Sequence, residues 1–378
     1  MRNCANWAGR LDLNCDFVNI RGLDGMQSFR LHPYILRVKK KTPEGIAINC
    51  EDLLMADQNV INEALKKAQK ISWENFGKKI RFYAPSFVYY KTSYFCSSPR
   101  TFPSISVTGN FCALKCKHCG GVVLNTMYSA TTPQRLVTLC RELKKKGAVG
   151  CLISGGCLSD GSVPLDNFAD ALTLIKKELD LTIIVHTGVI NRESAERLEK
   201  AEVDAALIDI IGSDDTIHEI YQFKARTVDY EQSLANLSRV GISLVPHVLV
   251  GLHYGKLKGE FQALKMISEH QPSAVIIISF MPIHGTLMEN VAPPTPVDIG
   301  KVILTARLMM PKTPLVLGCM RPKGKHKIET DKLAIKAGVN AIAFPAEEAI
   351  KLAEQMDYQI SFSSTCCSQI YADLQQNF

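Results

Sequence analysis

The sequence predicts an α/β fold, a parallel (β/α)8 barrel of the TIM type, with an N-terminal extension and a C-terminal tail. Eight short apolar runs, rich in Ile, Val and Leu, recur from about residue 104 to about residue 343. Amphipathic helical stretches separate these runs, an alternation typical of parallel sheets that are buried on both faces. Eight strands in roughly 250 residues suit a barrel, either closed or incompletely closed. An open, doubly wound sheet is the alternative.

Each expected strand is an apolar run that ends in turn residues. The runs begin near Ser104, Val149, Leu181, Asp204, Ile242, Ala274, Pro314 and Val339. The expected helices span residues 133–147, 164–179, 191–201, 259–270, 296–309 and 328–337. Pro133 suits the first turn of a helix, and Gly147 suits a helix end. Barrels of this kind carry their chemistry at the carboxyl ends of the strands, so functional residues are expected there.

Three parts of the chain are expected. Residues 1–100 form an N-terminal extension that is partly helical, with a helix from Leu53 to Phe76 and a β-prone stretch after it, FYAPSF. Residues 101–358 form the barrel. Residues 359–378 form a tail that carries Cys366 and Cys367 and that can fold over the barrel mouth.

Composition narrows the class of protein. Hydrophobic residues make up 46% of the chain and charged residues 21%, a balance typical of soluble globular proteins. The net charge of +7 is too small to argue for a nucleic-acid partner. The start of the chain lacks a signal-peptide pattern, and the longest apolar run is too short to span a membrane. A cytoplasmic protein is therefore expected, and its 13 cysteines are expected to be reduced thiols rather than a disulfide framework.

The strongest motif follows the first expected strand, SISVTG. Cys112, Cys116 and Cys119 lie on the loop at the carboxyl end of that strand. Three thiolates on one loop can ligate three irons of a [4Fe–4S] cluster and leave the fourth iron open to a small chelating molecule. The alternative is a zinc site, which needs four ligands; His118 is a candidate for the fourth, although it adjoins Cys119.

This spacing resembles the radical S-adenosylmethionine (SAM) superfamily. The resemblance implies that the three cysteines hold a [4Fe–4S] cluster and that SAM chelates the open iron. His118 matches the position that packs near the adenine of SAM. Ser154, Gly155 and Gly156 are similar to a motif whose backbone carbonyls receive the SAM ammonium group. Cys157 stands where that motif has a glutamate, which leaves the role of the side chain open.

The resemblance extends to the biotin-synthase-like branch, and within it to the second protein of the archaeal-type two-component lipoyl synthase. It implies that Thr187, Asp209 and Gly251 lie near SAM. Arg321 matches a segment that carries an arginine ligand of a second cluster in biotin synthase. The strand positions of that cluster's cysteines are apolar here, for example at Val245. For Asp209 and Arg321, a salt bridge at the barrel end is the alternative.

A second set of residues is expected on the functional face. An auxiliary iron–sulfur cluster there can draw its ligands from Cys157, Cys319, Arg321, Cys366 and Cys367. The alternative is that these cysteines are small buried hydrophobic residues. His247 and His253 flank the end of the fifth strand, where each either lines the substrate cavity or is a structural histidine.

The resemblance implies an enzyme that reductively cleaves SAM and removes hydrogen from an unactivated carbon. The leading hypothesis is sulfur insertion into an octanoyl carrier protein, as in lipoyl formation. The expected partners are an electron donor of the ferredoxin or flavodoxin type, an acyl or lipoyl carrier protein and a partner synthase subunit. One alternative is a radical SAM rearrangement or cofactor maturation without sulfur insertion. Another is a barrel that binds metal without catalysis.

Overall fold

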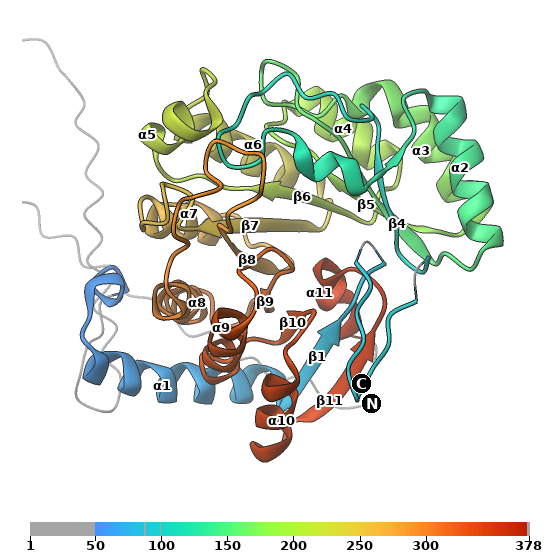
Figure 1. Cartoon of the computed structure of the whole chain (residues 1–378). Helices are drawn as coiled ribbons and strands as arrows, with labels where there is room; N and C mark the ends of the chain where they lie inside the picture. Colours follow the sequence, from blue (N-terminus) through green and yellow to red (C-terminus); the bar gives the residue numbers. More distant parts are fainter. Residues whose placement is uncertain (1–49, 87, 99, 376–378) are drawn as a thin grey trace, which may run out of the picture. The chain divides into compact units, whose positions relative to one another are not determined.

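The computed structural model describes residues 50–86, 88–98 and 100–375 (Figure 1). The part of the expected N-terminal extension before residue 50 lies outside them. In the described residues the strands are β1 (Lys79–Tyr83), β2 (Ser104–Ser106), β3 (Tyr128–Ser129), β4 (Gly150–Ser154), β5 (Thr182–His186), β6 (Ala205–Asp209), β7 (Leu244–Val250), β8 (Val275–Ser279), β9 (Leu315–Leu317), β10 (Ala341–Ala343) and β11 (Gln359–Ser363).

One parallel sheet contains all of these strands. Its order is β11-β1-β10-β9-β8-β7-β6-β5-β4-β2-β3, so the sheet ends at β11 and β3 and forms an incompletely closed barrel. From β4 to β10 the order in the sheet follows the order in the chain. A doubly wound sheet reverses direction part-way, so that alternative is wrong. Each of the eight strands predicted from the sequence is present.

The predicted domain boundaries at residues 100 and 358 do not separate domains. Strand β1 comes from the expected extension and β11 from the expected tail, yet they pair in register, with Phe82 opposite Phe362. Figure 1 shows these two segments from opposite ends of the described chain side by side. The reason is burial: Ile80 and Phe82 of β1 are almost fully buried in the main core, so this strand is integral to the sheet.

The helices among the described residues are α1 (Gln58–Phe76), α2 (Pro133–Lys145), α3 (Ala169–Leu179), α4 (Arg192–Lys200), α5 (Asp214–Thr216), α6 (Thr227–Val240), α7 (Glu260–Ser268), α8 (Pro296–Met309), α9 (Lys325–Lys336), α10 (Glu347–Gln355) and α11 (Ile370–Asp373). Helix α1 begins at Gln58 rather than at Leu53, because the Asp57 carboxylate accepts hydrogen bonds from the backbone N–H groups of Asn59 and Val60. Helices α6 and α10 were not predicted.

Alternate residues of the central strands face two separate cores. In β6, Ala206 and Ile208 pack with the outer helices, whereas Ala205 and Leu207 face the lumen of the open barrel. This division follows from the two-residue period of a strand. It explains why the strands read as continuous apolar runs: both faces of the sheet are covered.

Residues near the end of the described chain fill part of the lumen. Ile370 is fully buried in the lumen core, and the Tyr371 hydroxyl donates to the Asp204 carbonyl, 2.9 Å away, just before β6 begins. Asp373 forms an ion pair at 2.7 Å with Arg81 of β1. The expectation that the tail folds over the mouth is therefore wrong, because its apolar residues are buried inside the barrel. None of the described helices combines the length and hydropathy that a membrane span requires.

Candidate active site

The three cysteines lie on the loop that follows β2, as the sequence predicts. Cys116 is buried, and Cys112 and Cys119 are half-buried. The loop turns back on itself where the Gly120 N–H donates to the Cys116 carbonyl at 2.8 Å. The sulfurs of Cys116 and Cys119 and a ring nitrogen of His118 lie within 4.8 Å of one another. Adjacency in sequence therefore does not keep His118 away from the two thiols.

Hydrogen bonds between thiols favour thiolates in this loop. The Cys157 thiol donates to Cys112 and lowers the pKa of Cys112 to about 6. The same contact raises the pKa of Cys157 itself. The Cys116 thiol, together with His118, lowers the pKa of Cys119 to about 4, and the same contact raises the pKa of Cys116, so the thiolate is favoured at two of the three loop cysteines. Because thiolates are the form that ligates metals, the loop is electrostatically suited to a metal centre.

Two glycines after β4 allow the cysteine loop to pack closely. A Cβ at Gly156 would lie 2.0 Å from the Phe111 carbonyl oxygen and 2.7 Å from the Cα of Cys112. A Cβ at Gly155 would lie 3.0 Å from the Thr108 hydroxyl, which in turn accepts a hydrogen bond from the Gly156 N–H at 2.7 Å. The Gly-Gly pair is therefore required here by close packing of backbone against backbone.

A π-helical turn from Ile217 to Tyr221 supports the other side of the loop, and sequence reasoning missed it. The Lys117 N–H donates to the Ile220 carbonyl at 2.8 Å. The rings of His118 and Tyr221 pack with centroids 5.1 Å apart. Single π-turns occur frequently at functional sites, but they have no sequence signature that would have identified this one.

A cavity of about 390 Å³ lies in the lumen beside the cysteine loop, toward the carboxyl ends of the strands. Most of its wall is apolar, with Leu152, Leu207, Leu249, Ile276 and Ile278 contributed by neighbouring strands. The predicted site residues that line it are Cys112, Cys116, His118, Cys119, Ser154, Gly155, Gly156, Cys157, Asp209, Cys319, Cys366 and Cys367. The fold thus brings most of the predicted set to one place.

A polar group interrupts this apolar wall. His186 and Asp209 end β5 and β6, and His247 lies in the middle of β7. The ligand-type atoms of these three residues lie within 4.8 Å of one another. Although burial alone opposes it, His186 lowers the pKa of Asp209 to about 2, and Asp209 raises the pKa of His186. Burial lowers the pKa of His247 to about 4, so that imidazole is neutral at pH 7.

Comparison with known proteins identifies the domain that contains this site. Residues 106–256 match the family model of the Radical SAM superfamily. The matched range begins in β2 and ends after β7, so it includes the cysteine loop and the polar group. The chain carries a radical SAM domain.

Two curated proteins similar to this chain are biotin synthases. The enzyme of Zymomonas mobilis is 26% identical over 253 residues, which cover 64% of this chain and 72% of the relative. That of Ehrlichia canis is 29% identical over 185 residues, covering 48% of this chain and 55% of the relative.

Two solved structures share the fold. A methylornithine synthase superposes with a TM-score of 0.60 at 15% identity, covering 86% of this chain and 95% of the other. A maturase of the [FeFe]-hydrogenase superposes with a TM-score of 0.60 at 17% identity, covering 85% of this chain and 73% of the other. At such identities the likeness concerns the fold alone, and it confirms the predicted α/β barrel.

The residues present fit the cofactors that a radical SAM domain implies. Three thiols lie on one loop, where the sulfurs of Cys116 and Cys119 are within 4.8 Å of each other and the pKa values of Cys112 and Cys119 are lowered, which suits a [4Fe–4S] cluster bound through three cysteines. The Nδ1 atom of His118 is buried without a hydrogen-bond partner, so this ring nitrogen is available to a bound molecule. A zinc ion on Cys116, His118 and Cys119 is the alternative that metal analysis distinguishes.

Thr187 and Gly251 lie beside the cavity rather than in its wall. The Thr187 hydroxyl donates to the Gly188 carbonyl at 2.8 Å. The Gly251 N–H donates to the Glu260 carboxylate at 2.8 Å, and Pro294 fills the space where a Cβ would stand. Both residues shape the loops at the mouth, and their contact with SAM stays a prediction.

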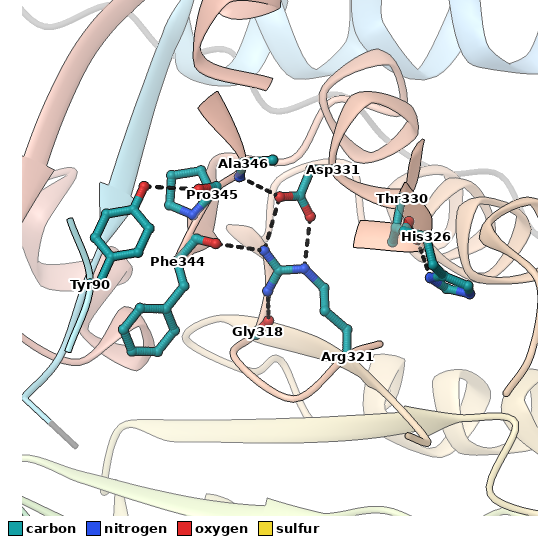
Figure 2. Close-up of polar contacts among 9 residues, drawn as sticks. All are labelled: Tyr90, Gly318, Arg321, His326, Thr330, Asp331, Phe344, Pro345 and Ala346. Atoms are coloured by element: carbon teal, nitrogen blue, oxygen red, sulfur yellow. Dashed lines mark hydrogen bonds and ion pairs between the residues drawn. The ribbon is translucent and has the colours of Figure 1, made fainter. Parts of the chain in front are cut away.

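The salt-bridge alternative describes Arg321 in this structure, and its role as a cluster ligand stays a prediction. Its guanidinium is buried and forms an ion pair with Asp331, with nitrogen–oxygen distances of 2.7 and 3.0 Å (Figure 2). It also donates to the carbonyls of Gly318 and Phe344, so its donors are engaged away from the cavity. The pair fixes the loop after β9 to α9.

The five residues expected at one auxiliary cluster do not form one group. Cys157 contacts Cys112 of the first cysteine loop. Cys319, Cys366 and Cys367 lie close together at another part of the cavity wall, where burial raises the pKa of Cys319 to about 11. Of the expected cysteines, only Cys319, Cys366 and Cys367 can therefore share one auxiliary cluster.

Replacing Gly156 with alanine is expected to remove most of the iron that the protein binds after anaerobic reconstitution. The added Cβ collides with the backbone of the cysteine loop and must displace it. The control is Gly300→Ala in α8, where a Cβ meets only ordinary contacts, 3.5 Å from Leu333. Iron and sulfide analysis measures the effect, and equal iron content in the two variants would contradict the role given to Gly156.

The Arg321→Ala variant is expected to lose about 3–5 kcal/mol of free energy of unfolding, because it leaves the Asp331 carboxylate buried without its partner. Urea unfolding followed by circular dichroism measures the loss. In the control, Lys325→Ala breaks an exposed pair with Glu329 and is expected to cost less than about 1 kcal/mol. Similar losses of unfolding free energy in both variants would show that the buried pair stabilises the fold no more than the exposed pair does.

Proposed function

We propose that this radical SAM protein removes hydrogen from an unactivated carbon of an aliphatic substrate held in the lumen cavity. The observation that carries the proposal is that the cysteine loop opens onto a largely apolar cavity of about 390 Å³. A bound cluster of this kind supplies the electron that cleaves SAM and so provides a carbon radical for the hydrogen transfer.

The chain's own residues bind and orient the two reactants. Cys112, Cys116 and Cys119 hold the cluster through thiolates, and His118 packs beside SAM. The backbone of Ser154–Gly156 lines the cavity next to the loop, where its carbonyl groups can accept hydrogen bonds from the SAM ammonium group. Apolar side chains from β4 to β8 exclude water and so protect a reactive radical from other hydrogen donors.

The reaction that we favour is sulfur insertion into a fatty acyl chain, such as an octanoyl group on a carrier protein. An apolar lumen suits an acyl chain, and Cys319, Cys366 and Cys367 offer thiols for an auxiliary cluster that donates sulfur. The electron donor of the ferredoxin or flavodoxin type, the carrier protein and a partner synthase subunit belong to this proposal.

A rearrangement or maturation reaction without sulfur insertion is the second candidate. The observation that favours it is the polar group of His186, Asp209 and His247, which suits a substrate with a polar end more than a purely apolar chain. Products of SAM cleavage and of the substrate, analysed for sulfur by mass spectrometry, distinguish the two candidates.

Cys112→Ala is expected to abolish formation of 5′-deoxyadenosine from SAM and a strong reductant, because the cluster loses one of its three thiolate ligands. The assay uses anaerobically reconstituted protein and chromatographic detection of the nucleoside. Cys96→Ala, at an exposed cysteine, is the matched control and is expected to retain full activity. Zinc in place of iron in the purified wild type, with no nucleoside formed, would overturn the proposal.

The sulfur-insertion step predicts a second cluster. Reconstituted protein is expected to bind about eight irons per chain, rather than about four, if an auxiliary four-iron cluster is present. Cys366→Ser is then expected to lower the iron to about four while leaving SAM cleavage intact. Mass spectrometry of an octanoylated carrier protein tests for added sulfur. A wild type with about four irons would remove the sulfur donor and leave the second candidate.

A further inference from the structure

Three polar side chains on neighbouring strands converge in the lumen. Asp209 of β6 and His247 of β7 are partners in the parallel register, so their side chains project side by side. His186 is the last residue of β5, the strand on the other side of β6, and its Nε2 lies 3.4 Å from the Asp209 carboxylate. The rings of the two histidines are 5.6 Å apart between centroids. We propose that His186, Asp209 and His247 bind a divalent metal ion of the zinc or ferrous class.

The orientation of His247 is fixed in the manner of a metal ligand. Its Nδ1 lies 3.2 Å from the Val245 carbonyl, to which it donates a hydrogen bond. This places the remaining lone pair on Nε2. Histidines that bind metals commonly donate the other ring N–H to a backbone carbonyl, which fixes both the tautomer and the ring orientation.

Asp209 supplies a carboxylate oxygen that the protein itself does not satisfy. Its Oδ1 is buried and has no hydrogen-bond partner, and at 3.4 Å the contact with His186 is longer than a charge-assisted hydrogen bond. Yet the side chains of His186 and Asp209 keep 26% and 30% of their surface exposed, because they border the cavity. The group is therefore built into the wall and still reachable by a ligand.

Two imidazoles and one carboxylate are a donor set that zinc and ferrous ions accept. Three protein ligands leave coordination positions open, and here the open side faces the cavity. A metal ion there can bind an oxygen, nitrogen or sulfur atom of the substrate and so position the carbon to be attacked. This second site uses none of the three cysteines of the loop and does not depend on sulfur insertion, and it assigns Asp209 to the metal ion rather than to SAM.

The competing occupant of this region is a metal bound by thiols. Cys366 lies close enough to His186 to affect the pKa of that imidazole, so its sulfur is an alternative donor. Ligation by Cys366 would make the centre sulfur-rich, whereas the proposed site has only nitrogen and oxygen ligands. Cobalt(II) separates the two, because thiolate ligation adds a charge-transfer absorption that imidazole and carboxylate do not give.

The test titrates cobalt(II) into the full chain after anaerobic reconstitution and removal of excess iron. The wild type is expected to take up about one cobalt per chain, with visible absorption of the nitrogen and oxygen type. His247→Gln and Asp209→Asn are each expected to weaken cobalt binding roughly 100-fold or more, since removing a direct ligand costs at least as much as removing an outer partner. Iron and sulfide contents, measured on the same samples, are expected to stay unchanged and so show that the variants fold.

His253→Gln is the matched control. His253 lies shortly after the same strand, but its Nδ1 contacts the Thr216 hydroxyl at 3.2 Å and it does not line the cavity. Cobalt binding in this variant is expected to equal that of the wild type. The proposal is overturned by no cobalt uptake, by uptake that survives both His247→Gln and Asp209→Asn, or by a thiolate charge-transfer band that disappears in Cys366→Ser.

Discussion

An open sheet has a concave face that must be covered, and the last residues of the chain meet that requirement. Ile370 is buried in the lumen, and the Tyr371 hydroxyl donates to the Asp204 carbonyl at the amino end of β6. Asp373 forms an ion pair with Arg81 at 2.7 Å. A buried apolar plug of this kind excludes water from one end of the barrel. The cavity is therefore confined to the carboxyl ends of the strands, where the loops carry the functional groups.

The cysteine loop depends on neighbours that are remote in sequence. On one side Gly156 leaves no space for a side chain against Phe111 and Cys112, and on the other the π-turn ending at Tyr221 contacts Lys117 and His118. A metal site needs ligands held close to their bound geometry, and such outer contacts provide that support. The spacing of the three cysteines alone would not fix their positions.

Features that depend on local sequence were predictable, and those that depend on register were not. The eight apolar strands and the three-cysteine motif are contained in short segments, and all are present. Strand β11 was missed because QISFS is only partly buried and reads as an edge. The partner of Arg321 in its salt bridge could not be named from the sequence, because Asp331 lies on the helix that follows and only the fold shows that the two meet.

The group formed by His186, Asp209 and His247 shows the same limit, and its energetics argue for a function. Only the parallel register of β5, β6 and β7 brings the three side chains together. The Asp209 carboxylate borders the cavity beside His186, and its buried Oδ1 keeps no hydrogen bond within the protein. Apolar residues at the same positions would extend the wall formed by Leu207 and Leu249. A polar group that the fold does not need is best explained by something that it binds.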